Sequence, residues 1–151
     1  MRKQLMAHKI IAVYGNSGSY KTTTALSLAR YMAAKGTNII LVGADTTKPP
    51  LPIAAPFDRD MILKNNYMAT DHVGILSYNI RENANTYAVV SQERIDDLYM
   101  QLRQQSDTDI IVDCTSDISQ SKLTAKAIIT ADVVIELLTC DTNGLVFDGS
   151  Q

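Results

Sequence analysis

Short apolar runs alternate with segments of helical periodicity along most of the chain. Residues 10–14 and 109–113 contain nearly uninterrupted apolar runs, which are typical of strands buried on both faces of a sheet. Further strands are predicted at residues 38–42, 74–78 and 132–138. Because helical segments separate these strands, the pattern predicts an α/β domain in which a parallel sheet has helices on both faces.

The helical segments have clear apolar faces. Residues 24–35 place Leu26, Ala29, Met32 and Ala33 on one side, and Gly36 ends the segment. A second amphipathic helix is predicted after Ser91, and residues 121–130 predict a third. The prolines at residues 49–52 exclude both a helix and a central strand there, and a helical turn is predicted at 58–64.

The segment between the first strand and its helix is rich in small residues. A loop that leads from a buried strand into a helix can point its amides at a phosphate, and the helix adds its own unpaired amides. Lys21 would then reach the outer phosphates, while the Thr22 hydroxyl would bind magnesium. An ordinary strand-turn-helix corner is the alternative. The predicted phosphate-binding loop consists of Gly15, Asn16, Ser17, Gly18, Ser19, Tyr20, Lys21, Thr22 and Thr23.

Tyr20 departs from the strict form of this loop, which has glycine directly before the lysine. If the backbone there adopts a positive φ, a residue with a Cβ costs about 1–2 kcal/mol. The ring either intrudes on the nucleotide or turns outward to stack on a ligand or partner. The sequence leaves both arrangements open.

Three aspartates follow predicted strands, namely Asp45, Asp113 and Asp141. Ligands of parallel sheets bind at the carboxyl ends of the strands. One such carboxylate can hold magnesium, and another can orient an attacking water. An aspartate in this position is otherwise commonly a turn former or helix cap. Asp113 is the strongest candidate because three apolar residues precede it.

Composition narrows the class of protein. The chain has 151 residues, of which 46% are hydrophobic, and this suits one globular domain. Its net charge of −2 gives no overall basic field for nucleic acid or an anionic membrane. Cys114 and Cys140 each follow an apolar run, so we expect buried free thiols in a reducing cytosol. No run reaches the ~18 apolar residues of a membrane span, and a cytoplasmic protein is the default.

Four segments resemble the ParA/MinD group of P-loop ATPases, which includes the TadZ/CpaE-like proteins associated with pilus assembly; they are residues 15–35, 39–45, 107–113 and 131–139. The resemblance implies a P-loop NTPase domain over residues 1–151, with a Rossmann-like three-layer α/β/α arrangement. It also implies a domain that is incomplete at its C-terminus, because relatives run longer. Asp45 would position the hydrolytic water and Lys21 would hold phosphate, which makes these two the candidate catalytic residues. Thr22 and Asp113 would be the magnesium ligands.

The same resemblance implies ATP and Mg²⁺ as cofactors and a homodimer as the working form. The expected function is that of a weakly hydrolysing positioning ATPase that localises a Tad-type pilus or secretion machine. Such a protein would be cytoplasmic, and it would reach the membrane or cell pole through partners or a missing C-terminal segment. Asn16 stands where the group has a signature lysine that reaches across a nucleotide-sandwiched dimer. Together with Tyr20, this departure leaves open an alternative, a scaffold that keeps the ATPase fold without depending on hydrolysis.

Overall fold

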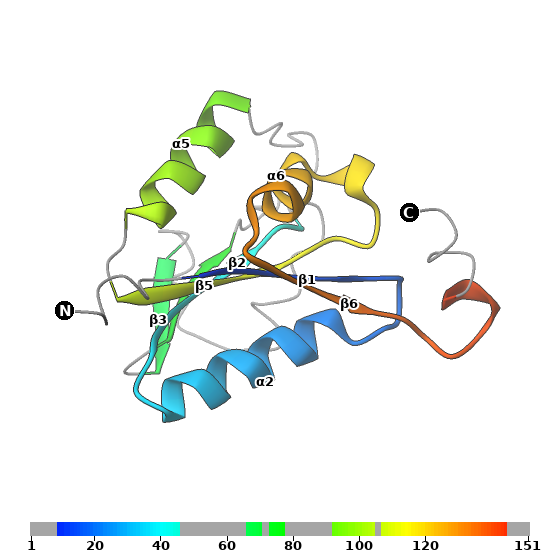
Figure 1. The fold of residues 1–151 in the computed structure, drawn as a ribbon, viewed down its shortest axis with the longest axis horizontal. Coiled ribbons are helices and arrows are strands. Elements are labelled where there is room, and N and C mark those ends of the chain that lie inside the picture. Colours follow the sequence, from blue (N-terminus) through cyan, green and yellow to red (C-terminus); the bar gives the residue numbers. More distant parts are fainter. Residues whose placement is uncertain (1–8, 46–65, 71–72, 78–91, 105–106, 145–151) are drawn as a thin grey trace, which may run out of the picture.

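The computed structural model describes residues 9–45, 66–70, 73–77, 92–104 and 107–144 of the chain. These residues form a six-stranded sheet with the strand order β3-β4-β2-β5-β1-β6 (Figure 1). Neighbouring strands are parallel, except that β3 runs antiparallel to β4. The predicted parallel sheet is therefore confirmed, with an antiparallel strand that the sequence analysis did not predict. The strands are β1 (Ile10–Gly15), β2 (Asn38–Gly43), β3 (Asn66–Thr70), β4 (Val73–Ser77), β5 (Thr108–Asp113) and β6 (Val133–Leu137).

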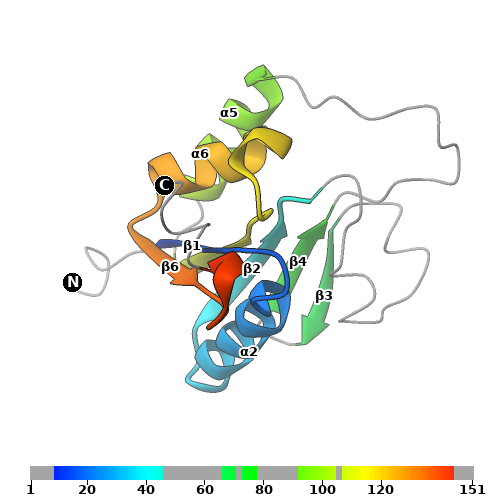
Figure 2. The ribbon, with the colours of Figure 1, turned by 90° about the vertical axis from the view of Figure 1, so that its right-hand side faces the viewer.

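Helices cover both faces of this sheet, as predicted (Figures 1 and 2). Helix α2 (Lys21–Ala34) lies on one face, while α5 (Gln92–Arg103) and α6 (Lys122–Thr130) lie on the other. A short 3₁₀ helix, η1 (Ile118–Gln120), precedes α6. The structure differs from the predicted start of α2 at residue 24, because residues 21–23 of the glycine-containing segment already form its first turn.

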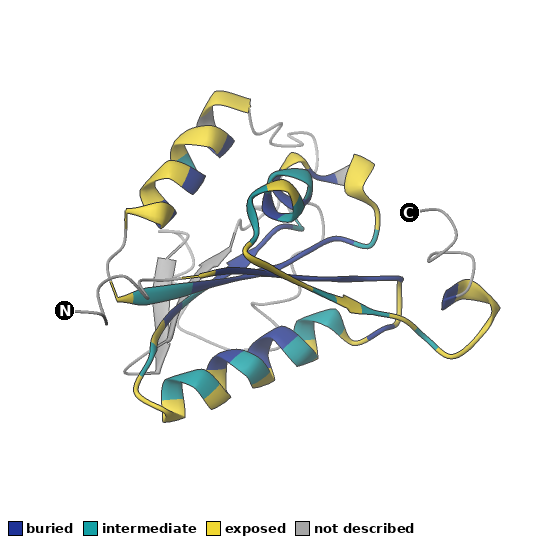
Figure 3. Cartoon of the chain, in the orientation of Figure 1, coloured by how far each residue is buried: buried dark blue, intermediate teal, exposed yellow. Residues whose placement is uncertain are grey.

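The core follows the two-residue period of the strands. In β1 every residue is buried. Ile11 and Val13 belong to the hydrophobic cluster between the sheet and α2, whereas their neighbours in β1 belong to the cluster between the sheet and helices α5 and α6. In Figure 3 the whole of β1 accordingly has the colour of buried residues. A strand that contributes to two clusters must be apolar throughout, which explains the uninterrupted run in the sequence. Because β1 is buried along its whole length, it fixes the position at which the following loop begins.

Strand β6 differs from the buried strands because it lies at an edge of the described sheet. Val133 and Val134 are 41% and 45% exposed, so this strand is not buried on both faces. The expectation of two buried thiols is correspondingly half wrong. Cys140, just beyond this edge strand, is exposed, whereas Cys114 after β5 is buried. Burial raises the pKa of the Cys114 thiol to about 12, which keeps it protonated.

Several predictions fall outside the described residues: the proline-rich segment at 49–52, the helical turn at 58–64 and the cap at Ser91. Within the described ranges, no helix combines the length and apolar character needed to cross a bilayer.

Candidate functional site

The loop between β1 and α2 approaches the end of β6 closely. A Cβ on Gly15 would collide with the backbone oxygen of Leu137 and would lie 2.7 Å from Ser19 Oγ. Gly18 has a φ of +81°, a conformation that residues with a Cβ rarely adopt. The two glycines therefore have separate reasons to be present. Gly15 permits a close approach, and Gly18 permits a sharp turn.

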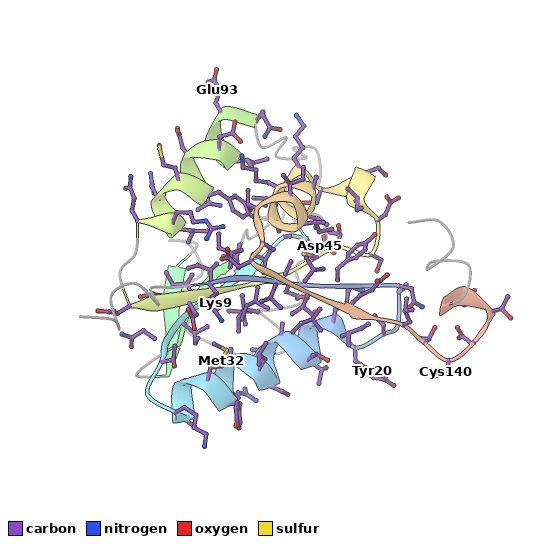
Figure 4. All side chains as sticks on the ribbon, viewed as in Figure 1. Lys9, Tyr20, Met32, Asp45, Glu93 and Cys140 are labelled. Carbon is purple, nitrogen blue, oxygen red and sulfur yellow. The ribbon has the colours of Figure 1, made fainter. Side chains whose placement is uncertain are left out.

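Tyr20 occupies the left-handed region, with φ 62° and ψ 36°. Its side chain is 76% exposed, and in Figure 4 it points away from the ribbon at the start of α2. Of the two arrangements left open by the sequence, the structure has the outward one. The ring consequently does not fill the hollow of the loop.

The N-terminus of α2 is left uncapped. Tyr20 makes no side-chain capping hydrogen bond, and Thr24 N donates to Tyr20 O at 2.9 Å. The amides of residues 21–23 precede that bond, so they lie in the part of a helix that has no intrahelical acceptors. The Ser121 side chain, in contrast, caps α6 by accepting from Thr124 N. An uncapped helix start behind a glycine turn is suited to binding an anion.

Lys21 is the first residue of α2, and its side chain extends back across the loop to Asn16. Its Nζ donates to Ser116 Oγ at 2.8 Å and to the backbone oxygen of Asn16 at 3.1 Å. Burial lowers the pKa of this ammonium, and the negative charges of Asp113 and Asp45 oppose that effect. The site therefore holds a partly desolvated cation whose hydrogen-bond acceptors are neutral oxygens.

Thr22 and Asp113 meet beside this lysine. Thr22 Oγ1 donates to Asp113 Oδ2 at 2.6 Å, and Asp113 is only 3% exposed. Its second oxygen, Oδ1, is buried and has no hydrogen-bond partner among the described residues. Burial raises the pKa of Asp113 to about 6, against the hydrogen bond from Thr22 and the charge of Lys21. A hydroxyl next to a carboxylate with a free oxygen is a donor set that suits Mg²⁺.

The other two strand-end aspartates behave differently from each other. Asp45, after β2, contributes to the electrostatic field at both Lys21 and Asp113, so it lies in the same neighbourhood. The Asp141 carboxylate instead accepts from Thr139 Oγ1 at 2.5 Å and from Gly144 N at 3.0 Å. Asp141 thus organises its own turn, and its donor Thr139 also bonds to Asn16 of the loop, so this carboxylate is connected to the loop on the β6 side.

The Asn16 side chain faces the end of β6 and not the hollow of the loop. Its Oδ1 accepts from Thr139 N at 3.0 Å, and its Nδ2 donates to Thr139 Oγ1 at 2.8 Å. Among the remaining predicted loop residues, Ser17 and Thr23 are exposed. Ser19 is buried, and its Oγ has no partner among the described residues.

Two contacts of the site involve residues that the sequence analysis did not select, Ser116 and Thr139. Each is a hydroxyl residue shortly after a strand, Ser116 after β5 and Thr139 after β6. The rule that ligands bind at strand ends applies to them as it does to the aspartates. A search of those ends for hydroxyls as well as carboxylates would have found both.

A comparison with protein families gave a match over most of the chain. The model of the family described as "CobQ/CobB/MinD/ParA nucleotide binding domain" matches residues 10–138. That span runs from the start of β1 to one residue beyond β6. It includes the loop and two of the three strand-end aspartates, Asp45 and Asp113, whereas Asp141 lies beyond it. A search of curated protein sequences found no match.

Solved structures share the fold at low sequence identity. Cobyrinic acid a,c-diamide synthase from Mycobacterium smegmatis, with bound ATP analogue and magnesium, is 22% identical over 89% of this chain and 62% of its own, with a TM-score of 0.65. A ParA family ATPase from Chlorobium tepidum TLS is 11% identical over 95% of this chain and 65% of its own, with a TM-score of 0.67. The present chain thus spans less than two thirds of the length of either protein. At these identities the likeness concerns the fold.

Proposed function

We propose, since the chain belongs to the CobQ/CobB/MinD/ParA nucleotide-binding domain family, that its β1–α2 loop binds ATP together with Mg²⁺. The observation that carries the proposal is the uncapped start of α2 beside the Lys21 ammonium and the Thr22–Asp113 pair. The ATP analogue and magnesium named for the Mycobacterium smegmatis enzyme support the choice of ligand. On this proposal residues 1–151 act as a single nucleotide-binding domain.

Each group has a role in this proposal. The loop amides and Lys21 bind the phosphates, with Lys21 on the outer ones. Thr22 and Asp113 hold Mg²⁺, which would neutralise phosphate charge when bound. Asp45 orients the attacking water, in keeping with its place in the electrostatic neighbourhood of Lys21 and Asp113. The proposal includes slow hydrolysis, which rests on the resemblance to the ParA/MinD group.

Titration with a fluorescent ATP analogue, with and without Mg²⁺, tests the binding part. Lys21→Ala should abolish binding, because the half-buried ammonium supplies the cationic contact to the phosphates. Lys35→Ala is the matched control, since Lys35 is exposed beyond the C-terminal end of the same helix. Equal affinity in the wild type and the Lys21 variant would refute the proposal.

Turnover needs a separate measurement. Asp45→Ala should slow phosphate release from ATP by at least about tenfold while leaving analogue affinity within about twofold, because a water-orienting group acts on the chemical step. Asp97→Ala, an exposed change on α5, serves as the control. A full rate in the Asp45 variant would remove that residue from the mechanism.

The cellular role in this proposal is that of a ParA/MinD-like positioning ATPase, closest to TadZ/CpaE-like proteins, which localises a Tad-type pilus or secretion machine as a homodimer. Its support is the resemblance of the loop and of the β2 end, where Asp45 follows Leu-Val-Gly-Ala. A cytoplasmic location with recruitment to the membrane or pole follows from such a role. Sedimentation with and without MgATP tests the dimer, and fluorescence microscopy of a tagged chain tests the location.

One observation favours a second candidate, an ATPase-fold scaffold that is independent of hydrolysis. The Asn16 side chain is held by Thr139 within the same chain, at the position where the ParA/MinD group has its dimer-bridging lysine. For such a scaffold, Lys21→Ala would leave partner binding and location intact. Loss of either one in that variant would eliminate the scaffold reading.

A further inference from the structure

The Lys21 ammonium is held by neutral oxygens, and one of them belongs to a residue outside the predicted loop. Ser116 Oγ accepts from Lys21 Nζ at 2.8 Å, the shorter of the two hydrogen bonds of that ammonium. The ion pairs within the described ranges join Arg103 to Asp132 and Lys126 to Asp96, so neither involves Lys21. A half-buried cation without a paired anion favours the arrival of one. Ser116 therefore lies where an anion attracted by Lys21 would come to rest.

The backbone on both sides of Ser116 is anchored. Thr115 N donates to Thr124 Oγ1 at 2.9 Å, and Thr115 Oγ1 donates to the backbone oxygen of Asp117 at 2.8 Å. Thr124 is fully buried in α6, whose first turn is capped by Ser121. These hydrogen bonds fix the turn after β5 against a helix. The Ser116 hydroxyl is thus preorganised beside Lys21, as a ligand-binding group needs to be.

A serine hydroxyl has one donor and two acceptor lone pairs. Lys21 uses one lone pair of Ser116 Oγ, and the hydroxyl proton has no acceptor within the described parts of the chain. We propose that Ser116 is a phosphate-binding residue, which accepts from Lys21 and donates its proton to an outer-phosphate oxygen of a nucleoside triphosphate. This inference rests on the proposed function, and it adds a contact from the turn after β5 to the contacts of the glycine-containing loop.

The test compares affinities for MgATP and MgADP, measured by isothermal titration calorimetry on the full chain. Ser116→Ala should weaken MgATP binding about tenfold, the size expected for a lost hydrogen bond to a charged group. MgADP affinity should change less than about twofold, because the outer phosphate is absent. Ser116→Thr keeps the hydroxyl and should restore most of the ATP affinity. Ser27→Ala, an exposed serine on α2, is the matched control and should bind both nucleotides as the wild type does.

The outcomes separate this inference from the function beneath it. A wild type that binds ATP beside a Ser116→Ala variant of equal affinity would overturn the contact alone. An equal loss for ATP and ADP would also overturn it, since that result marks general damage to the loop. Tighter ATP binding by the variant would show that Ser116 merely restrains Lys21. Absence of ATP binding by the wild type would remove the proposed function, and this contact with it.

Discussion

Tyr20 holds a backbone conformation that costs free energy for any residue with a Cβ. Among the described non-glycine residues, Tyr20 and Asp107 have a positive φ, at 62° and 54°. Aspartate tolerates this region because its short polar side chain can hydrogen-bond locally, whereas tyrosine gains nothing comparable. Strain of this kind is commonly found at functional sites, where the surrounding structure maintains it. Here it lies at the N-terminus of α2, directly before the phosphate-binding lysine of the proposed function.

Replacement of Tyr20 by glycine should stabilise the protein by up to about 1 kcal/mol. Relief of left-handed strain gives about 1–2 kcal/mol, and the greater entropy of glycine in the unfolded chain takes back about half. The ring is mostly exposed, so little burial is lost. Urea unfolding of both forms measures the difference.

Tyr31 provides the control for that change. It is 63% exposed like Tyr20, but it lies inside α2, where glycine is a poor helix former. Tyr31→Gly should therefore destabilise by about 0.5–1 kcal/mol. Opposite signs at the two tyrosines are the expected result. Destabilisation by both substitutions would mean that the Tyr20 ring makes a stabilising contact.

At the scale of elements, Asn16 joins the loop to the end of β6. Both functional groups of its side chain bond to Thr139, and Asn16 is 5% exposed. Asn16→Ala removes these bonds and should destabilise the protein by about 1–2 kcal/mol. Hydrogen exchange at the Thr139 amide should accelerate by a larger factor than at amides in the middle of β1, because the edge strand loses its tether.

Asn143→Ala is the matched control for the tether, since Asn143 is exposed in the same segment of the chain. Its effect on the free energy of unfolding should stay within about 0.5 kcal/mol. Unchanged exchange at Thr139 in the Asn16 variant would show that pairing with β1 alone holds the end of β6.

At the scale of the whole molecule, the sequence predicts the strands and helices that have a clear apolar pattern of their own, and it misses those that depend on tertiary contacts. Strand β1 is apolar from Ile10 to Tyr14, and β5 is apolar in its Ile-Ile-Val centre, because helices cover both faces of the sheet; that pattern is visible without a structure. Strand β3 escapes prediction because its sequence, Asn-Tyr-Met-Ala-Thr, has neither a long apolar run nor a strict alternation. Its strand character depends on antiparallel pairing with β4, which is a tertiary property. The exposure of Cys140 was missed for a similar reason, because sheet order decides which strand lies at the edge.

The contacts of the candidate site also fall into those that the sequence predicts and those that it does not. The strand-end rule predicts that Lys21, Thr22 and Asp113 gather at one place, and the structure puts Thr22 Oγ1 2.6 Å from Asp113 Oδ2. Whether these groups bind nucleotide and magnesium stays a prediction. The contacts of Ser116 with Lys21 and of Thr139 with Asn16 span 95 and 123 residues of sequence. They depend on the register of parallel strands, which periodicity does not specify.

The stability of the whole molecule should carry the signature of Asp113. Burial raises the pKa of this carboxyl from 3.8 to about 6 in the folded protein. The folded state therefore favours the protonated form, and the stabilisation from this group is fully present below about pH 3.8 and is lost as the pH rises through about 6. Above that pH an ionised, buried carboxylate opposes folding by up to about 3 kcal/mol, since each pKa unit corresponds to about 1.4 kcal/mol.

Asp113→Asn should consequently be more stable than the wild type at pH 8, by about 1–3 kcal/mol, and this gain should shrink by about 2 kcal/mol at pH 4.5. Urea unfolding across this range measures the gain, and Asp97→Asn on the exposed face of α5 should show no comparable trend. MgATP at a thousandfold excess over Kd should reverse the order, because the wild type then gains ligand stabilisation of about 4.1 kcal/mol, while the variant lacks the carboxylate for the metal. A variant that is less stable than the wild type at pH 8 without ligand would contradict the argument. That result would mean that further groups in the folded chain, besides Thr22 and Lys21, stabilise the ionised Asp113 carboxylate.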